Sequence, residues 1–204
     1  MVRNLEFDTI YHEHLSYLSL KPVVAFMRGF GMDVFDVRTQ AIHGGSFRVF
    51  VARAGTRPVE PSVGRHLRAE ADFGLHSLGT MRAFAARVEK TRDDLLWLLR
   101  ELKHDGHRIA ALSAPAKGMS LLNYLRVGRE TVDFATEKST LKIGRFTPGS
   151  HIPVLPDSEL LTRMPSHALL LAWNFADEIM SNLAPYKARG GKFIIPIPSP
   201  RVVG

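Results

Sequence analysis

The spacing of hydrophobic residues predicts one short helix and two strands in the first quarter of the chain. Residues 23–28 have helical spacing and run into Gly29 and Gly31, where a helix can end. Residues 32–37 and 46–52 alternate hydrophobic and polar side chains, as half-buried strands do. Because turn residues separate two strands that are close along the chain, we expect antiparallel neighbours.

The pattern of hydrophobic and polar residues changes after residues 55–61, a predicted linker that contains proline and glycine. A long helical stretch comes next, and Gly106 is its expected C-cap. Strands and helices then alternate, with strands predicted at 109–112, 132–136, 169–172 and 193–197 and helices at 119–125 and 177–188. This order is typical of an α/β fold on a parallel sheet. The chain thus divides into two parts, residues 1–54 and residues 55–204.

The composition is that of a globular protein without cysteine chemistry. Of the 204 residues, 45% are hydrophobic and 23% charged, so the chain is neither disordered nor collagen-like. Because cysteine is absent, disulfides, thiolate metal sites and cysteine nucleophiles are excluded. No apolar run approaches the roughly 20 residues that span a bilayer, and the N-terminus lacks the layout of a signal peptide. We therefore expect a cytoplasmic protein with no membrane partner.

The positive charge favours a phosphorylated small molecule over nucleic acid. Lysine and arginine number 27 against 20 aspartates and glutamates, which gives a formal net charge of +7. The cations are scattered, as Arg53, Arg68, Arg87 and Arg100 illustrate, and they form no block of like charges. Such scatter is typical of solvated helix faces, so no nucleic-acid partner is expected.

The densest cluster of chemically active side chains is Tyr11-His12-Glu13-His14. A phenol, a carboxylate and two imidazoles can supply a general base, a group that orients it and a hydrogen-bond donor. On a strand, His12 and His14 would share a face and could bind a metal together with His43, whereas Glu13 would point away. A loop whose polar side chains cap nearby backbone is the third interpretation. The residues alone leave these three interpretations open.

Two further loops contain residues suited to a ligand. His43, Gly44 and Gly45 precede the second predicted strand, where glycine allows close backbone approach but also makes an ordinary turn. The later loop GRFTPGSHIP combines Arg145 and His151 with turn-forming residues. Loops beyond strand ends in α/β sheets are places where ligands bind.

The segment SAPAKG at residues 113–118 follows a predicted strand and opens a predicted helix. Backbone N–H groups at a helix start, with Lys117 beside them, suit a phosphate, although neither a P-loop nor a GxGxxG pattern is present. Glu137 ends the next strand, either as a ribose-binding carboxylate or as an exposed charge. Trp173 and Asn174 follow a buried strand. The Trp173 indole either covers a base or sugar ring or packs in the core, which is the favoured interpretation, and Asn174 is expected to cap the following helix.

Together, these segments resemble the S-adenosylmethionine-dependent C-methyltransferases that act on nucleotide-linked deoxysugars. The resemblance runs from about Leu5 to Pro198 and includes FDTIYHEHLSYLSL, IHGGSFRVFVA, LLRELKHDGHRIAALSAPAKGMSLLNYL, EKSTLKIGRFTPGSHIPV and LLLAWNFADEIM with GGKFIIPIP. YHEH, APAKG, PGSHIP and WNFADEI in this order are far more specific together than singly. In one region the chain departs from the family, because Ser113 replaces a frequent glycine and Met119-Ser120 replaces a frequent Asn-Thr.

The resemblance implies an enzyme of three parts: a cysteine-rich zinc module, a central methyltransferase domain and a C-terminal Rossmann-like domain. Residues 1–54 would be the C-terminal remnant of the central domain, with the terminal strands of its class I sheet. Residues 55–204 would be the three-layer Rossmann-like domain with a long N-terminal helix. The glycine-rich turn for S-adenosylmethionine and the zinc cysteines have no match here, so no cofactor-binding or metal-binding residue is assigned.

The resemblance also implies a reaction. A base removes the proton beside the keto group of a nucleoside-diphosphate 4-keto-6-deoxyhexose, and the enolate takes a methyl group from S-adenosylmethionine. Carried onto this chain, His14 becomes the base, and Tyr11 and Glu13 position it and stabilise the developing negative oxygen. An imidazole with its ordinary pKa of about 6.5 suits a base at neutral pH. Candidate substrate-binding residues are His43, Gly44, Gly45, Lys117, Arg145 and His151.

The expected partners follow from this reaction. They are a nucleoside-diphosphate sugar and an N-terminal methyltransferase half, without which the chain is expected to be inactive. The chain would then be a truncated product, half of a split enzyme or a sequence begun at an internal methionine. Residues 1–52 would leave open strand edges and apolar faces, which also predicts self-association. The alternative is a non-catalytic module that binds a nucleotide sugar or scaffolds a pathway partner.

Overall fold

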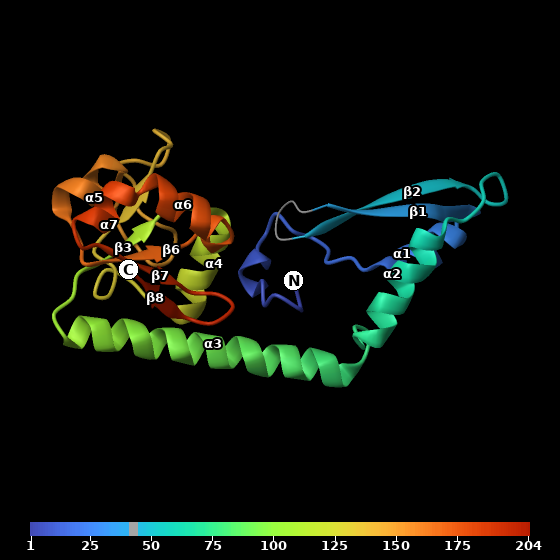
Figure 1. Cartoon of the computed structure of the whole chain (residues 1–204), viewed down its shortest axis with the longest axis horizontal. Helices are drawn as coiled ribbons and strands as arrows, with labels where there is room; N and C mark the ends of the chain where they lie inside the picture. The colour runs from blue at the N-terminus through green and yellow to red at the C-terminus, as the bar shows by residue number, and fades with distance from the viewer. Residues whose placement is uncertain (41–44) are drawn as a thin grey trace. The chain divides into compact units, whose positions relative to one another are not determined.

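The computed structural model describes residues 1–40 and 45–204, which form two compact units (Figure 1). The hairpin unit comprises residues 13–86 with Met1, and the Rossmann-like unit comprises residues 2–12 and 87–204. The elements in chain order are η1 (Phe7–Thr9), α1 (Leu20–Arg28), β1 (Met32–Gln40), β2 (Ser46–Arg53), α2 (Pro61–Asp72), α3 (Leu78–His104), β3 (Ile109–Leu112), α4 (Ala116–Leu125), β4 (Ala135–Glu137), β5 (Val154–Pro156), α5 (Ser158–Arg163), β6 (His167–Leu170), η2 (Trp173–Phe175), α6 (Ala176–Asn182), α7 (Ala184–Ala188), β7 (Lys192–Ile195) and β8 (Arg201–Val203).

The hairpin unit is built on the antiparallel pair β1–β2, as the alternation of side chains predicts. Its register runs from Met32 opposite Arg53 to Gln40 opposite Ser46. Helices α1 and α2 cover the pair, and their shared core of buried residues is Leu20, Val34, Val37 and Val63.

A carboxylate from α2 completes the N-terminus of α1. Ser19 makes no side-chain cap bond there. Instead, buried Glu70 accepts hydrogen bonds from the backbone N–H groups of Leu20 and Lys21, at 2.5 and 3.0 Å. The negative charge also suits the positive end of the helix dipole. This carboxylate therefore ties α1 to α2.

The Rossmann-like unit contains a six-stranded sheet in the order β5-β4-β3-β6-β7-β8. All strand pairs are parallel except β7–β8, and every residue of β3 and β6 is buried. From β3 the chain proceeds outward through β4 and β5, and it then returns to add β6 and β7 on the other side. The boundary between β3 and β6 is therefore the topological switch point of the sheet.

Helices cover both faces of this sheet. One core cluster joins Leu112, Leu170 and Phe193 to Leu160 of α5 and Tyr186 of α7, with side chains of α6 packed against it. Because strand side chains alternate, neighbouring residues such as Ala111 and Leu169 face the opposite side. Figure 1 shows α3 on that opposite side. The three-layer Rossmann-like arrangement is thus confirmed.

Several predicted elements differ from the observed ones in length or number. The predicted last strand, at 193–197, ends at Ile195, because Pro196 has no N–H group for the ladder. β8 follows and pairs antiparallel with β7. The three-residue strand β5 and the short helix α5 carry too few residues for a periodic signal.

Along the chain, the boundary between the two compact units falls within α3, between Ala86 and Arg87, and also between His12 and Glu13. The division predicted at residue 54 separates the end of the family's central methyltransferase domain from its C-terminal domain, and it stays a prediction. No helix within residues 1–40 and 45–204 combines the length and apolarity that a membrane span needs.

Candidate functional site

The switch point of the Rossmann-like unit is formed by the segments that follow β3 and β6. α4 begins shortly after β3, and a Cβ atom on its Gly118 would lie 2.7 Å from the Cβ of Leu171, directly after β6. Ser113, in the turn before α4, has a φ of +67°. The glycine of the APAKG motif is therefore explained by the close packing of these two segments, independently of any ligand.

Lys117, a predicted phosphate-binding residue, points into the protein at this switch point. Its side chain is 16% exposed, and its Nζ lies 3.7 Å from the carboxylate of Asp8. The Nζ also donates a hydrogen bond to Asn174 Oδ1 and lies 4.5 Å from the centre of the Trp173 ring. Burial lowers the pKa of Lys117, while Asp8 and Glu6 act to raise it. A phosphate at Lys117 would have to compete with these partners.

Asp8 of η1, for which the sequence predicts no role, lies at the centre of this cluster. Its side chain has no exposed surface, and its Oδ2 accepts a hydrogen bond of 2.6 Å from Trp173 Nε1. Its Oδ1 is buried and has no hydrogen-bond partner among the described residues. Burial raises the pKa of the Asp8 carboxyl, against the opposing effects of Lys117 and Trp173.

Glu137, at the end of β4, organises the neighbouring loops. Its carboxylate accepts hydrogen bonds from the Ala114 N–H at 3.3 Å and from Lys142 Nζ at 3.0 Å, as well as from the N–H groups of Lys138 and Ser139. Although burial acts to raise the pKa of Glu137, these hydrogen bonds hold it below its ordinary value. Glu137 therefore binds protein loops, which neither sequence interpretation foresaw.

The YHEH motif lies in the loop between η1 and α1. Tyr11 is half-buried and belongs to the Rossmann-like unit, and its ring centre lies 6.0 Å from that of His12. Glu13 and His14 are exposed and belong to the hairpin unit, where the His14 ring stacks on Tyr17 at 6.3 Å. Because the motif is not on a strand, the alternation that favoured a metal site is absent.

The glycine-rich loop before β2 is described only in part. His43 and Gly44, both predicted substrate-binding residues, lie outside the described residues. Gly45 directly precedes β2 with a φ of +116°, a conformation that favours glycine. In the ranges 1–40 and 45–204, no group of three or more histidine, aspartate or glutamate residues is placed to hold a metal ion.

Arg145 and His151 occupy an exposed loop that leads into β5. The carbonyl of Arg145 accepts a hydrogen bond from the N–H of Val154, the first residue of β5, and His151 has a φ of +52°. Because the strands are parallel, this loop lies where they begin, whereas Lys117 lies where β3 ends. The structure thus separates Arg145 and His151 from Lys117.

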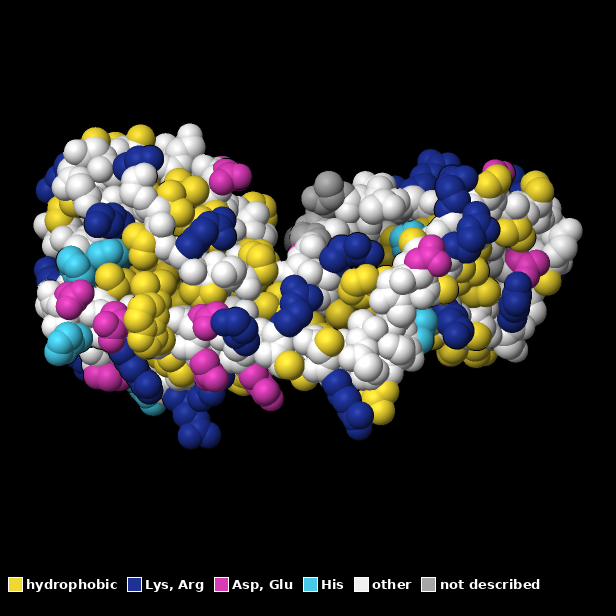
Figure 2. Space-filling view, turned by 60° about the horizontal axis from the view of Figure 1, so that its bottom comes forward, with side chains coloured by type: hydrophobic (Ala, Val, Ile, Leu, Met, Phe, Trp, Pro, Cys, Tyr) yellow, Lys and Arg dark blue, Asp and Glu magenta, His cyan; other side chains and the backbone are white. Residues whose placement is uncertain are grey.

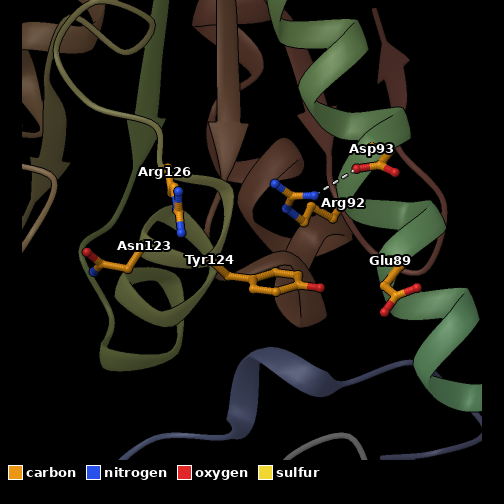
Figure 3. Close-up of a pocket in the computed structure, with 6 residues that line it drawn as sticks. All are labelled: Glu89, Arg92, Asp93, Asn123, Tyr124 and Arg126. Atoms are coloured by element: carbon orange, nitrogen blue, oxygen red, sulfur yellow. Dashed lines mark hydrogen bonds and ion pairs between the residues drawn. The ribbon is translucent and has the colours of Figure 1, made fainter.

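Lysine and arginine side chains form no concentrated patch on the face of the molecule that Figure 2 shows. Figure 2 shows lysine and arginine side chains spread over both units on the face in view, in agreement with their scatter along the sequence. A pocket of about 660 Å³ between α3 and α4 mixes both signs (Figure 3). Arg92 lies over the Tyr124 ring, 5.7 Å from its centre, and pairs with Asp93 at 3.0 Å. The pocket lining is Glu89, Arg92, Asp93, Asn123, Tyr124 and Arg126, which includes no predicted site residue.

The switch point does not fit S-adenosylmethionine. A cofactor there needs a glycine-rich turn after the first strand, so that backbone N–H groups can approach it. Here that turn contains Pro115, which has no N–H group, and η1 covers the position where a ligand would lie. The described residues thus provide packing at this position and no cofactor site.

Comparison with known proteins agrees with this architecture. A sequence profile of the C-methyltransferase C-terminal domain matches residues 41–198. Over all its 204 residues, the chain is 39% identical to the C-methyltransferase NovU of Streptomyces niveus. It covers 49% of that protein, so it spans about half the length of the curated relative that it matches. The chain therefore belongs to the C-methyltransferase family, and residues 41–198 are its C-methyltransferase C-terminal domain.

Proposed function

We propose that the chain is the C-terminal part of an S-adenosylmethionine-dependent C-methyltransferase that acts on a nucleotide-linked 4-keto-deoxysugar. The observation that carries this proposal is the intact Tyr11-His12-Glu13-His14 motif, in an exposed loop of a chain that belongs to the C-methyltransferase family. Methyl transfer to carbon requires a carbon nucleophile, and a base beside a ketone generates one.

In this proposal His14 acts as the general base. Its imidazole accepts the proton from the carbon next to the ketone, and the C–H electron pair becomes the carbon–carbon double bond of an enolate. Tyr11 donates a hydrogen bond to the enolate oxygen, which has gained the carbonyl π electrons. Glu13 accepts a hydrogen bond from the second ring nitrogen of His14 and fixes the orientation of the ring. The methyl donor would bind to the half of the enzyme that this chain does not match.

Deuterium exchange of the substrate tests the base without methyl transfer. The chain is combined with the half of NovU that it does not match and is incubated in D2O with a nucleoside-diphosphate 4-keto-6-deoxyhexose. We expect deuterium to enter beside the ketone, detected by mass spectrometry. Because a positioned base contributes about 10²–10⁴-fold, His14→Ala should slow the exchange at least 100-fold.

The exposed His104 at the end of α3 is the matched control, because its replacement by alanine removes an imidazole far from the motif in sequence. His104→Ala should exchange deuterium like the wild type. Undiminished exchange in His14→Ala would exclude His14 as the base. No exchange with the wild-type chain would contradict the proposed reaction.

The N-terminal half of the enzyme, which this chain does not match, is also the proposed partner of the hairpin unit. Leu15, Leu18, Phe26 and Phe30 are 92%, 65%, 62% and 68% exposed, which is unusual for such large hydrophobic residues. Since the chain matches about half of its relative, we assign these residues to the contact with the half of the enzyme that this chain does not match. Phe30→Ser should weaken co-purification of the two halves at least tenfold. Unchanged co-purification, or dimerisation of the chain through the same residues, would contradict this assignment.

A further inference from the structure

The segment before the YHEH motif is anchored to the switch point of the Rossmann-like unit. Leu5 and Phe7 are 1% and 8% exposed, and the Phe7 ring contacts Tyr124 of α4 edge-to-face at 5.6 Å between centres. Ser120 of α4 donates a hydrogen bond of 3.4 Å to the carbonyl of Ile10. Apolar and polar contacts thus hold both ends of η1 to α4.

Asp8 supplies the charged contact in the middle of this segment. Its carboxylate lies between Trp173, which follows β6, and Lys117, which follows β3. These are the two segments that face each other at the switch point, where an open α/β sheet would hold a ligand. The Asp8 carboxylate therefore occupies the place of a ligand anion, with a cation and an N–H donor directed at it.

Burial of the Asp8 carboxylate has a larger desolvation free energy than a contact that only fills space would need. A buried carboxylate with one oxygen unpartnered among the described residues loses hydration that it does not fully regain. An apolar residue at this position would fill the same space without that loss. The directional hydrogen bond from Trp173 Nε1 and the nearby charge of Lys117 favour one orientation of η1, which an apolar contact would not specify.

We propose that Asp8 is a positioning residue of the methyltransferase: held by Trp173 and Lys117, it fixes η1 at the switch point and thereby fixes Tyr11 of the YHEH motif on the Rossmann-like unit. The inference rests on the proposed function, since Tyr11 and His14 matter only if the motif is catalytic. It also assigns Lys117 to the protein's own carboxylate and away from the substrate phosphate.

Hydrogen exchange of the chain tests the anchor independently of catalysis. The N–H groups of Phe7, Ile10 and Tyr11 are bonded to carbonyls of Leu5, Phe7 and Thr9. In Asp8→Ala these amides should exchange at least tenfold faster, because local opening becomes easier. Asp8→Asn keeps an acceptor for Trp173 and should restore most of the protection. The control Asp94→Ala removes a half-exposed aspartate of α3 that pairs with Lys90, and it should leave the exchange of these three amides unchanged.

Catalysis by the combined halves tests the positioning role. Asp8→Ala should lower kcat at least tenfold and leave the KM for the sugar nucleotide within threefold, and Asp8→Asn should recover most of the rate. Unchanged amide exchange in Asp8→Ala would overturn the anchor. Faster exchange with unchanged kcat would overturn the positioning role. If the wild-type halves show no methyl transfer, the proposed function fails, and amide exchange alone still decides whether Asp8 anchors η1.

Discussion

Each unit contains a buried carboxylate that ties an N-terminal segment to distant parts of the chain, but the two carboxylates differ in how completely they are bonded. Glu70 in the hairpin unit accepts hydrogen bonds on both oxygens from the N–H groups of Leu20 and Lys21. Asp8 in the Rossmann-like unit is bonded at Oδ2 only, and its Oδ1 has no partner in the described part of the chain.

The difference separates a structural carboxylate from one that specifies a position. Glu70 satisfies two N–H groups at a helix start, which any folded protein must do. Asp8 accepts the single indole N–H of Trp173. An apolar side chain at position 8 would fill the same space with a smaller desolvation cost. We therefore expect Glu70 to matter mainly for stability and Asp8 mainly for the location of Tyr11 on the Rossmann-like unit.

The largest effect on stability is expected for Glu70→Ala. The variant leaves two helix N-terminal N–H groups without their acceptor, so the hairpin unit should lose about 3 kcal/mol of unfolding free energy. Glu70→Gln keeps one acceptor oxygen and should lose about half as much. Urea denaturation followed by circular dichroism measures both. Exposed Glu60→Ala is the control, and an equal effect in that variant would show that Glu70 is not special.

The second prediction concerns the pH dependence of the Rossmann-like unit. His167, 2% exposed at the start of β6, has its pKa lowered to about 4 by burial, with His107 and Lys192 adding to the shift. An unfolded histidine titrates near 6.5, so the unfolded state binds more protons between the two values. The contribution of neutral His167 to the unfolding free energy should be fully present above pH 6.5, and the unfolding free energy should fall by about 2 kcal/mol as the pH drops toward 4.

His167→Gln provides the check on that assignment. Its unfolding free energy should depend less on pH in the same window, because glutamine does not titrate. A slope equal to that of the wild type would assign the pH dependence to other groups. Once the contribution of His167 is removed, the contribution of Asp8, which has the opposite sign, can be measured separately.

The third prediction compares one helix glycine from each unit. Gly118→Ala places a methyl group 2.7 Å from Leu171 and should destabilise the Rossmann-like unit by about 1–3 kcal/mol. In α2, Gly64→Ala meets nothing closer than 3.4 Å and should stabilise the hairpin unit by about 0.5–1 kcal/mol. Thermal unfolding measures both. Stabilisation by Gly118→Ala would contradict the close packing at the switch point.

The smallest effect on stability is expected for Asp8→Asn. Because burial raises the pKa of Asp8, its charged form destabilises the native state at neutral pH. Asn is neutral, so the variant should be within about 1 kcal/mol of the wild type at pH 7, or slightly more stable. Any advantage should shrink as the pH falls and Asp8 takes up its proton. A loss as large as that of Glu70→Ala would remove the distinction between the two carboxylates.

The fold could be predicted from the sequence because its signals are local. Alternation predicts the β1–β2 pair, and the order of strands and helices predicts the parallel sheet. The antiparallel strand β8 was missed, since three residues after a run of prolines carry no periodic pattern. The full extent of β6 was also missed, because it begins at the polar His167, which is buried through tertiary packing.

The candidate site was predictable only in part. The sequence predicts that the segment around Lys117 follows a strand end, and Lys117 does lie in the first turn of α4, shortly after β3. Its role in binding a phosphate stays a prediction, and in the structure its Nζ lies 3.7 Å from the Asp8 carboxylate. Asp8 could not be found from local pattern, because its partner Trp173 is 165 residues away in the sequence. Glu70 is likewise 50 residues from the helix start that it caps. Contacts between residues so far apart in the sequence form only when the whole fold brings them together, so no local sequence pattern predicts them.

The indole resonance of Trp173 tests the anchoring of η1 by Asp8 most directly. In the wild-type chain, the Nε1–H signal of Trp173 is followed by NMR across an acid titration, with exposed Trp97 as the internal reference. Since Nε1 donates to Asp8, its signal should lie downfield of the Trp97 signal and should titrate with a pKa above the ordinary aspartate value of 3.8. A Trp173 signal that coincides with that of Trp97 and does not titrate would contradict the anchor.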